Sequence, residues 1–249
     1  MPAGRYARPP IAEAVIECRF GSAVSQATLA RFVRNTAREY PAPELTYEIS
    51  AQFRVVATGH EPEVRPEQKF SGYKLTGRDQ ADLVILGPDK IATIRLAPYL
   101  GWDNFIATAR QNYEILRKIT RHRKLVRVAT RYVNRLDIPI GDTSVVRTED
   151  YLLVEPRIPS IIPRINFFST SFVGTVPEIE GQVIVNAGTI PSPLIDNTSL
   201  LLHIDLFKEQ NLPRKEEEIW ELFGTLRRQK NVLFEAFITD RAREVFGRA

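Results

Sequence analysis

The order of apolar and polar positions along the chain predicts extended strands interrupted by long helices. Residues 11–20 alternate the two kinds of position, as a half-buried strand does, and the two prolines before them disfavour a helix. A Gly-Pro-Asp turn at 87–89 predicts a hairpin, whereas a charged, proline-rich loop is expected at 59–69. The other extended segments are expected at 45–58, 70–76, 81–86, 90–97, 126–139, 165–173, 182–190 and 199–207.

Apolar residues at helical spacing predict three helices. The first runs from a Ser25 cap to about Tyr40 and carries arginines on its outer face. The second covers about 102–120, and the third, opened by Pro213, covers about 213–237. The side chains expected to be mostly buried are Trp102, Phe105, Tyr113, Leu116, Trp220, Phe223 and Leu226.

The order of strand, helix, several strands and long helix occurs twice, over 11–120 and over 126–247. This order predicts an α+β fold, in which a largely antiparallel sheet packs against long amphipathic helices. Two arrangements stay open. Residues 1–123 and 124–249 are the halves of a duplicated strand-helix-strands-helix unit, or the chain is one continuous domain with helices on one face. The halves share no residue-by-residue repeat.

Composition narrows the functional classes. Of 249 residues, 43% are hydrophobic and 26% charged, which is typical of a globular protein and not of a disordered chain. No apolar run approaches the ~20 residues of a membrane helix, and the first ten residues do not resemble a secretory signal. We therefore expect a cytoplasmic protein without membrane contact. Cys18 and the three scattered histidines lack metal-ligand spacing, so neither a metal nor a cofactor is expected.

Basic residues run from the end of the second helix into the strand at 126–139. The residues that could hold an anion are Arg117, Arg121, Arg123, Lys124, Arg127, Arg131 and Arg135. Because strand side chains alternate, the last three share one face, and Tyr132 and Asn134 lie on the other. Guanidinium groups match phosphate oxygens, so this face could bind nucleic acid. The alternative is that the helix-end residues favour a helix C-terminus, while the strand arginines pair with acids on neighbouring strands.

Catalytic motifs are absent from the sequence. Neither glycine-rich phosphate motifs nor the G-x-S-x-G serine motif occurs. His203 and Asp205 share one face of a strand but stand ~7 Å apart, too far for a direct hydrogen bond. No catalytic residue is assigned, and whether the protein is an enzyme stays open, with a non-enzyme favoured.

Four segments together resemble a sporadically distributed family of bacterial proteins of about 250 residues with no assigned activity. They are the PPIAEAV start at 9–15, WDNF at 102–105, RYVNR at 131–135 and the FEAFITD tail at 234–240. The patchy distribution of that family implies genes exchanged between bacteria, such as those of defence or toxin systems.

Three functional hypotheses follow. The leading one is a non-enzymatic binding or accessory protein whose arginine face contacts an anionic partner, with nucleic acid favoured. The second is a protein-interaction module or homodimer that uses the apolar segments 161–168 and 233–237. The third is a small-molecule sensor or enzyme with a pocket between sheet and helix, built around Tyr132, Asn134, His203 and Asp205.

Overall fold

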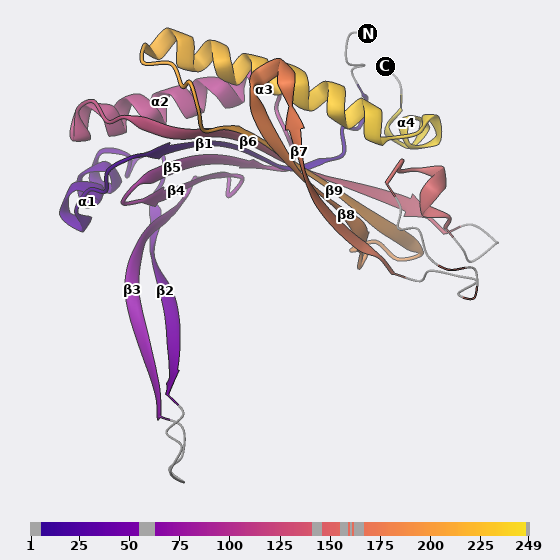
Figure 1. Ribbon diagram of the computed structural model, residues 1–249, viewed down its shortest axis with the longest axis horizontal. Coiled ribbons are helices and arrows are strands. Elements are labelled where there is room, and N and C mark those ends of the chain that lie inside the picture. Colours follow the sequence, from indigo (N-terminus) through magenta and orange to yellow (C-terminus); the bar gives the residue numbers. More distant parts are fainter. Residues whose placement is uncertain are drawn as a thin grey trace.

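A computed structural model of the chain describes residues 6–54, 63–140, 146–154, 159, 161 and 167–247. Within them, nine strands form one antiparallel sheet in the order β2-β3-β4-β5-β1-β6-β9-β8-β7 (Figure 1). With its helices, this sheet confirms the predicted α+β class. The strands are β1 (Ile11–Phe20), β2 (Ala42–Arg54), β3 (Glu63–Thr76), β4 (Asp82–Gly87), β5 (Lys90–Leu96), β6 (Leu125–Pro139), β7 (Ser169–Val176), β8 (Gly181–Ile190) and β9 (Asn197–Lys208).

Four helices accompany the sheet in the described residues: α1 (Gln26–Asn35), α2 (Trp102–Thr120), α3 (Glu216–Phe237) and α4 (Asp240–Phe246). The two longest, α2 and α3, lie across the same face of the sheet (Figure 1). Ser25 caps α1 by accepting a hydrogen bond from the backbone N–H of Thr28. None of these helices is long and apolar enough to span a membrane.

The centre of the sheet is the antiparallel pair β1 and β6. Val15 stands opposite Arg131 in this pair, and Arg19 stands opposite Arg127. On its other edge β1 pairs with β5, and β6 pairs with β9. One continuous sheet therefore contains strands from both of the halves proposed from the sequence, residues 1–123 and 124–249.

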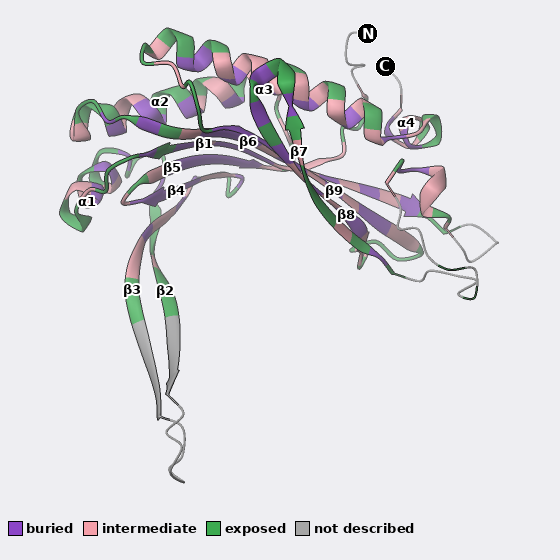
Figure 2. Ribbon diagram, in the orientation of Figure 1, coloured by how far each residue is buried: buried purple, intermediate pink, exposed green. Residues whose placement is uncertain are grey.

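The main core lies between the sheet and the helices. Along β6, alternate side chains such as Val128, Tyr132 and Leu136 are buried beneath the helix layer (Figure 2). Phe105 of α2 and Phe223 of α3 face them from above, and the other rings expected in this core are also buried, except that Trp102 is only partly covered. The period-2 pattern of the strand thus places the aromatic side of β6 under the helices.

Several predicted boundaries move in the structure. The first helix ends at Asn35 rather than near Tyr40, and α3 begins at Glu216 rather than at 213. The loop expected at 59–69 is partly wrong, because β3 already begins at Glu63 and passes through Pro66. Over that stretch β3 pairs with β2 and not with β4, so one of its edges makes no ladder hydrogen bonds. A proline, which has no N–H to donate, is tolerated at such an edge. The long β2–β3 hairpin extends away from the helix layer (Figure 1).

The start and end of the described chain meet beside α3. The backbone N–H of Ala7 donates to the carbonyl of Gly247 at 2.9 Å. Tyr6 packs edge-on against Phe234 of α3 and Phe246 of α4. This contact brings the N-terminal segment next to the cavity described below.

Candidate functional site

The arginine face of β6 lies on the side of the sheet away from the helices, as its alternation predicts. Arg131 donates to Glu13 of β1 at 3.2 Å, and Arg135 pairs with Asp137 at 3.0 Å. Arg131 thus pairs with an acid on a neighbouring strand, as the pairing alternative expects, whereas the acid that holds Arg135 lies on β6 itself.

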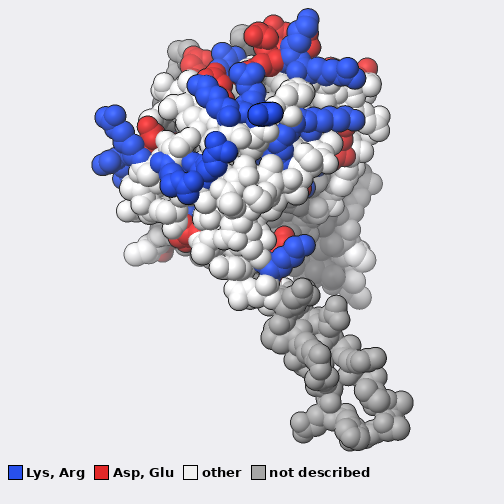
Figure 3. All heavy atoms as spheres, turned by 90° about the vertical axis from the view of Figure 1, so that its left-hand side faces the viewer, with Lys and Arg blue, Asp and Glu red and all other residues white. Residues whose placement is uncertain are grey.

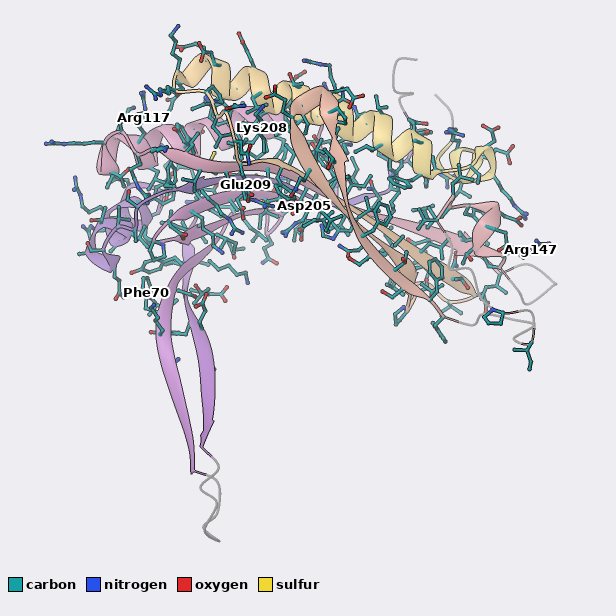
Figure 4. All side chains as sticks on the ribbon, viewed as in Figure 1. Phe70, Arg117, Arg147, Asp205, Lys208 and Glu209 are labelled. Atoms are coloured by element: carbon teal, nitrogen blue, oxygen red, sulfur yellow. The ribbon has the colours of Figure 1, made fainter. Side chains whose placement is uncertain are left out.

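Arg127 is the most enclosed arginine of the three. Its guanidinium lies 3.3 Å from Asp205, 3.1 Å from Glu209 and 3.6 Å from Glu17. The same group stacks over the Phe207 ring, 3.7 Å from its centroid. Figure 4 shows Asp205 of β9 and Glu209, the residue directly after β9, near the centre of the molecule. A phosphate could replace these carboxylates at Arg127 only by leaving Asp205 and Glu209 without their cation, since Glu17 also pairs with Arg19 at 2.7 Å.

The helix-end part of the basic run behaves differently. Arg121 and Lys124 are exposed, and neither has a carboxylate partner in the described structure. Arg117 is exposed but pairs with Glu216 at 3.0 Å. Arg123 turns inward, where it donates to the carbonyls of Ser22 and Pro88, and burial lowers its pKa. Arg123 is therefore held by backbone acceptors of this chain, unlike the exposed Arg121 and Lys124.

The four residues expected to share one pocket lie on opposite faces of the sheet, so that prediction is wrong. Tyr132 and Asn134 point toward the helices, whereas His203 and Asp205 point toward the arginine face. Residues that stand opposite each other on paired strands point to the same face, and neighbours along a strand point to opposite faces. Tyr132 stands opposite Ile204, so it shares a face with Ile204 and not with His203. Two of the four residues still line a cavity.

On the arginine face, His203 bonds to Asn186, with 2.9 Å between its Nδ1 and the amide Nδ2. Burial, reinforced by Arg131, lowers the pKa of His203, so the imidazole is neutral at pH 7. Burial also raises the pKa of the Asp205 carboxyl, against the opposing effect of the arginines. His203 and Asp205 thus form no acid-base pair with each other, and each is held by its own neighbour.

A cavity of about 680 Å³ lies between the sheet and the helices. Its walls come from residues 99–104 at the start of α2, from Tyr132 and Asn134 of β6, from one face of α3 and from the N-terminal segment. This volume falls in the range of pockets that hold small organic molecules. Much of the wall is aromatic, contributed by Tyr6, Tyr99, Trp102, Tyr132 and Phe234.

Lys230 of α3 is the most unusual group in the wall. Only 5% of the residue is exposed, and its Nζ lies 3.9 Å from the centroid of the Tyr132 ring. Its ammonium has neither a carboxylate nor a hydrogen-bond acceptor among the described residues. Burial lowers the pKa of Lys230 to about 7, the Arg227 charge lowers it further, and Glu235 offsets part of the shift. An unpaired buried ammonium is costly, so an acceptor in the cavity would stabilise it.

The N-terminus of α2 adds a second source of positive potential. Gly101 precedes the helix with φ 99° and supplies no side-chain cap. The first bond across this end joins the N–H of Phe105 to the carbonyl of Gly101, so the amides of residues 102–104 have no partner one turn back. Such amides and the helix dipole favour a negative group. A side chain at Gly101 would meet no atom within 4 Å, so there is space beside it.

Hydroxyl and guanidinium groups complete the cavity. The Tyr99 and Tyr132 hydroxyls lie 3.4 Å apart, and burial raises the pKa of both, so both remain protonated donors. The Arg227 guanidinium stacks over the Trp102 ring, 5.4 Å from its centroid. Glu235 already accepts the Tyr6 hydroxyl at 2.7 Å and pairs with Arg243 at 3.0 Å. Two acids line this cavity, which we call the Lys230 pocket: Glu235, which is already engaged, and the exposed Asp103 in the first turn of α2, and neither pairs with Lys230 in the described structure.

Sequence reasoning missed Lys230 and Arg227 as candidate site residues. A signal was present. The spacing of Phe223, Leu226, Lys230 and Phe234 places the lysine on the buried stripe of the helix.

The apolar segments expected at an interface have mixed surroundings. Phe234 lies inside 233–237 and is buried in this chain's own core. In the other segment, Phe168 is buried, Phe167 and Ile161 are exposed, and residues 162–166 lie outside the described residues.

No protein-family model and no curated protein matches this chain. The resemblance carried by its four segments therefore stays a prediction, and the functional argument depends on the geometry alone.

Proposed function

We propose that the protein binds a small organic anion with a flat or apolar body in the Lys230 pocket. This proposal takes up the small-molecule alternative of the sequence hypotheses. The observation that carries it is the buried, unpartnered ammonium of Lys230 facing a cavity. Arg227 and the uncapped start of α2 favour the same sign of charge in the ligand, and the aromatic wall favours a flat body.

Calorimetry with benzyl phosphate and benzyl alcohol tests this proposal, because the two compounds differ only in the anionic group. We expect benzyl phosphate to bind and benzyl alcohol to bind at least about tenfold more weakly, since a hydrogen bond to a charged group contributes about 1.5–3 kcal/mol. Arg227→Met should weaken the phosphate by a similar factor. Arg228→Met, which removes an exposed arginine next along α3, is the control. Equal binding of both compounds, or equal affinities of the two variants, would contradict the proposal.

We also propose a second function, nucleic-acid binding, at a different place from the strand arginines. Six exposed cations come from α1, from the C-terminal end of α2 and from the turns that follow these two packed helices, and none has a carboxylate partner in the described part of the chain. Figure 3 shows Lys and Arg side chains spread over this side of the molecule, with Asp and Glu between some of them. This basic surface consists of Arg31, Arg34, Arg38, Lys118, Arg121 and Lys124. Clustered, uncompensated cations supply the salt-dependent attraction to phosphate backbones.

Fluorescence polarisation with single- and double-stranded oligonucleotides tests the basic surface, beginning at ~50 mM salt. Reversing Arg34, Arg121 and Lys124 to Glu should lower the affinity and flatten its dependence on salt. Reversing Arg131 to Glu should not change that slope, because its guanidinium is engaged by Glu13. If the Arg131 variant changed the salt dependence and the triple variant did not, the nucleic-acid site would lie on the arginine face of β6 and not on the basic surface.

We propose further that the two halves of the chain are copies of one unit. The strand order supports this idea: β5, β4 and β3 follow outward from β1 as β9, β8 and β7 follow outward from β6. In each half a long helix follows the strand beside the central one. Superposing the first half on the second tests the proposal, since copies should match in strand paths and in the position of α2 on α3.

A further inference from the structure

Lys230 carries a primary amine, which is a nucleophile whenever it is not protonated. A covalent role requires that the amine can reach a ligand and that it is not held in an ion pair. Both conditions hold among the described residues, because the side chain lines the cavity and its Nζ lies over the Tyr132 ring without an ion-pair partner.

A second buried lysine shows what a structural role looks like in this fold. Lys208 of β9 is 8% exposed, almost as buried as Lys230. Its Nζ donates to the carbonyl of Ile179 at 3.0 Å and to Glu180 at 2.9 Å. Lys208 is thus fully engaged by protein acceptors, whereas Lys230 is left with none in the described structure. Burial of a lysine therefore does not by itself account for the isolation of Lys230.

We propose that Lys230 captures an aldehyde or ketone that carries an anionic group, and holds it as an imine. This inference rests on the proposed binding of small anions in the same pocket. Arg227 and the amides at the start of α2 would hold the anionic group, and Lys230 would meet the carbonyl carbon. The planar imine would lie against the aromatic wall.

The reaction needs no oxidant or reductant. The Nζ lone pair forms a bond to the carbonyl carbon, and the C=O π electrons move to the oxygen. A proton passes from nitrogen to that oxygen and gives a carbinolamine. The C–O bond then breaks as the oxygen takes a second proton from solvent and leaves as water, while the nitrogen lone pair forms the C=N bond, and the nitrogen returns its remaining proton to solvent. The products are one imine and one water.

Neighbouring groups favour each proton transfer. The paired hydroxyls of Tyr99 and Tyr132 remain protonated and can donate a hydrogen bond to the carbonyl oxygen. The charged groups that face Lys230 are Arg227 and Glu235, both on α3, and the net effect of the site is a pKa of about 7 for the amine. Near neutral pH, roughly half of the Lys230 side chains would be free amines, against about one in a thousand for an ordinary lysine.

Borohydride trapping tests the proposal. The protein is incubated with pyridoxal phosphate, a planar aldehyde that carries a phosphate, then treated with cyanoborohydride and mapped by peptide mass spectrometry. We expect the adduct at Lys230 to form tenfold to a hundredfold faster than at exposed Lys118, in line with the larger free-amine fraction, and Lys208 should not react. Lys230→Arg should abolish the adduct at that position. An uncharged aldehyde, benzaldehyde, should label Lys230 at least about tenfold more slowly.

Pyridoxine phosphate, the matching alcohol, separates failure of this inference from failure of the proposed function. If the alcohol binds in the pocket but the aldehyde gives no adduct at Lys230, the imine is excluded and anion binding stands. If neither compound binds, both proposals are excluded. Labelling spread evenly over exposed lysines would likewise overturn the imine proposal.

Discussion

Replacing Lys230 by Met should change how the stability of the protein depends on pH. The folded-state pKa of Lys230 is about 7, against the ordinary value of 10.5 for an unfolded lysine. The unfolded state therefore binds more protons between these values, and wild-type stability rises with pH through that window. Below pH ~7 both states are protonated, and the cost of burying the charge is constant. Met has no proton to bind, so the difference between the two proteins isolates this lysine.

The magnitude follows from the two pKa values. Between pH ~7 and pH ~9 the wild type should gain about 2 kcal/mol in unfolding free energy relative to Lys230→Met, since one pKa unit corresponds to about 1.4 kcal/mol. Between pH ~5.5 and ~6.5 the difference should stay nearly constant. Other titrating groups are common to both proteins and cancel.

Urea denaturation of ligand-free protein at a series of pH values measures this difference. Lys118→Met, at an exposed position of α2, is the control, and its difference from wild type should not change over the range. A constant difference between wild type and Lys230→Met across the whole range would refute the reasoning. It would mean that the ammonium keeps its charge in the folded state, with a partner or with water.

Three further predictions concern the rest of the molecule. Phe223→Ala should lower the unfolding free energy by about 3–5 kcal/mol because the ring is fully buried, whereas Val232→Ala on the exposed side of the same helix should cost under about 1 kcal/mol in the same urea titration. Arg127→Met should cost about 1–3 kcal/mol, because it leaves the partly buried Asp205 without its cation, and oligonucleotide binding by the folded protein should not change; a stable variant with weakened binding would contradict this. Gly72→Ala should lower the melting temperature, because φ is 148° and the added carbon would lie 2.1 Å from the carbonyl oxygen of Leu86; an unchanged melting temperature would show that the strand shifts freely there.

The parts of the fold that the sequence predicts well are those with one buried face. On β6 the alternation alone assigned Tyr132 to one side and Arg131 to the other, because a strand between a core and an open face must separate apolar from polar residues. The hairpin at 87–89 and the start of α2 were also predictable, since both depend on local turn and helix signals. The β2–β3 hairpin was not, because its charged, proline-bearing strand resembles a loop in composition.

The ion-pair partners of the charged side chains could not be predicted from the sequence. Arg131 and Glu13 are 118 residues apart along the chain, and the spacing of either segment specifies a face but not the neighbouring strand. The Lys230 pocket forms from four separate segments for the same reason. The sequence does predict the helical position of Lys230. That position places a charged side chain on the buried stripe of α3, which is costly without a partner and therefore indicates a candidate site.

The position of β1 constrains how a growing chain can fold. This strand is made before its neighbours, yet it lies in mid-sheet between β5 and β6, whose pairing residues begin at 90 and 125. A nascent chain therefore carries β1 with both hydrogen-bonding edges open until β5 has left the ribosome, and with one edge open until β6 follows. Such long-range pairing is slow, and open apolar edges promote association with other chains. Because β9 must still cover the free edge of β6, we expect release from the ribosome before residue 208 to leave the sheet open and the product prone to aggregation.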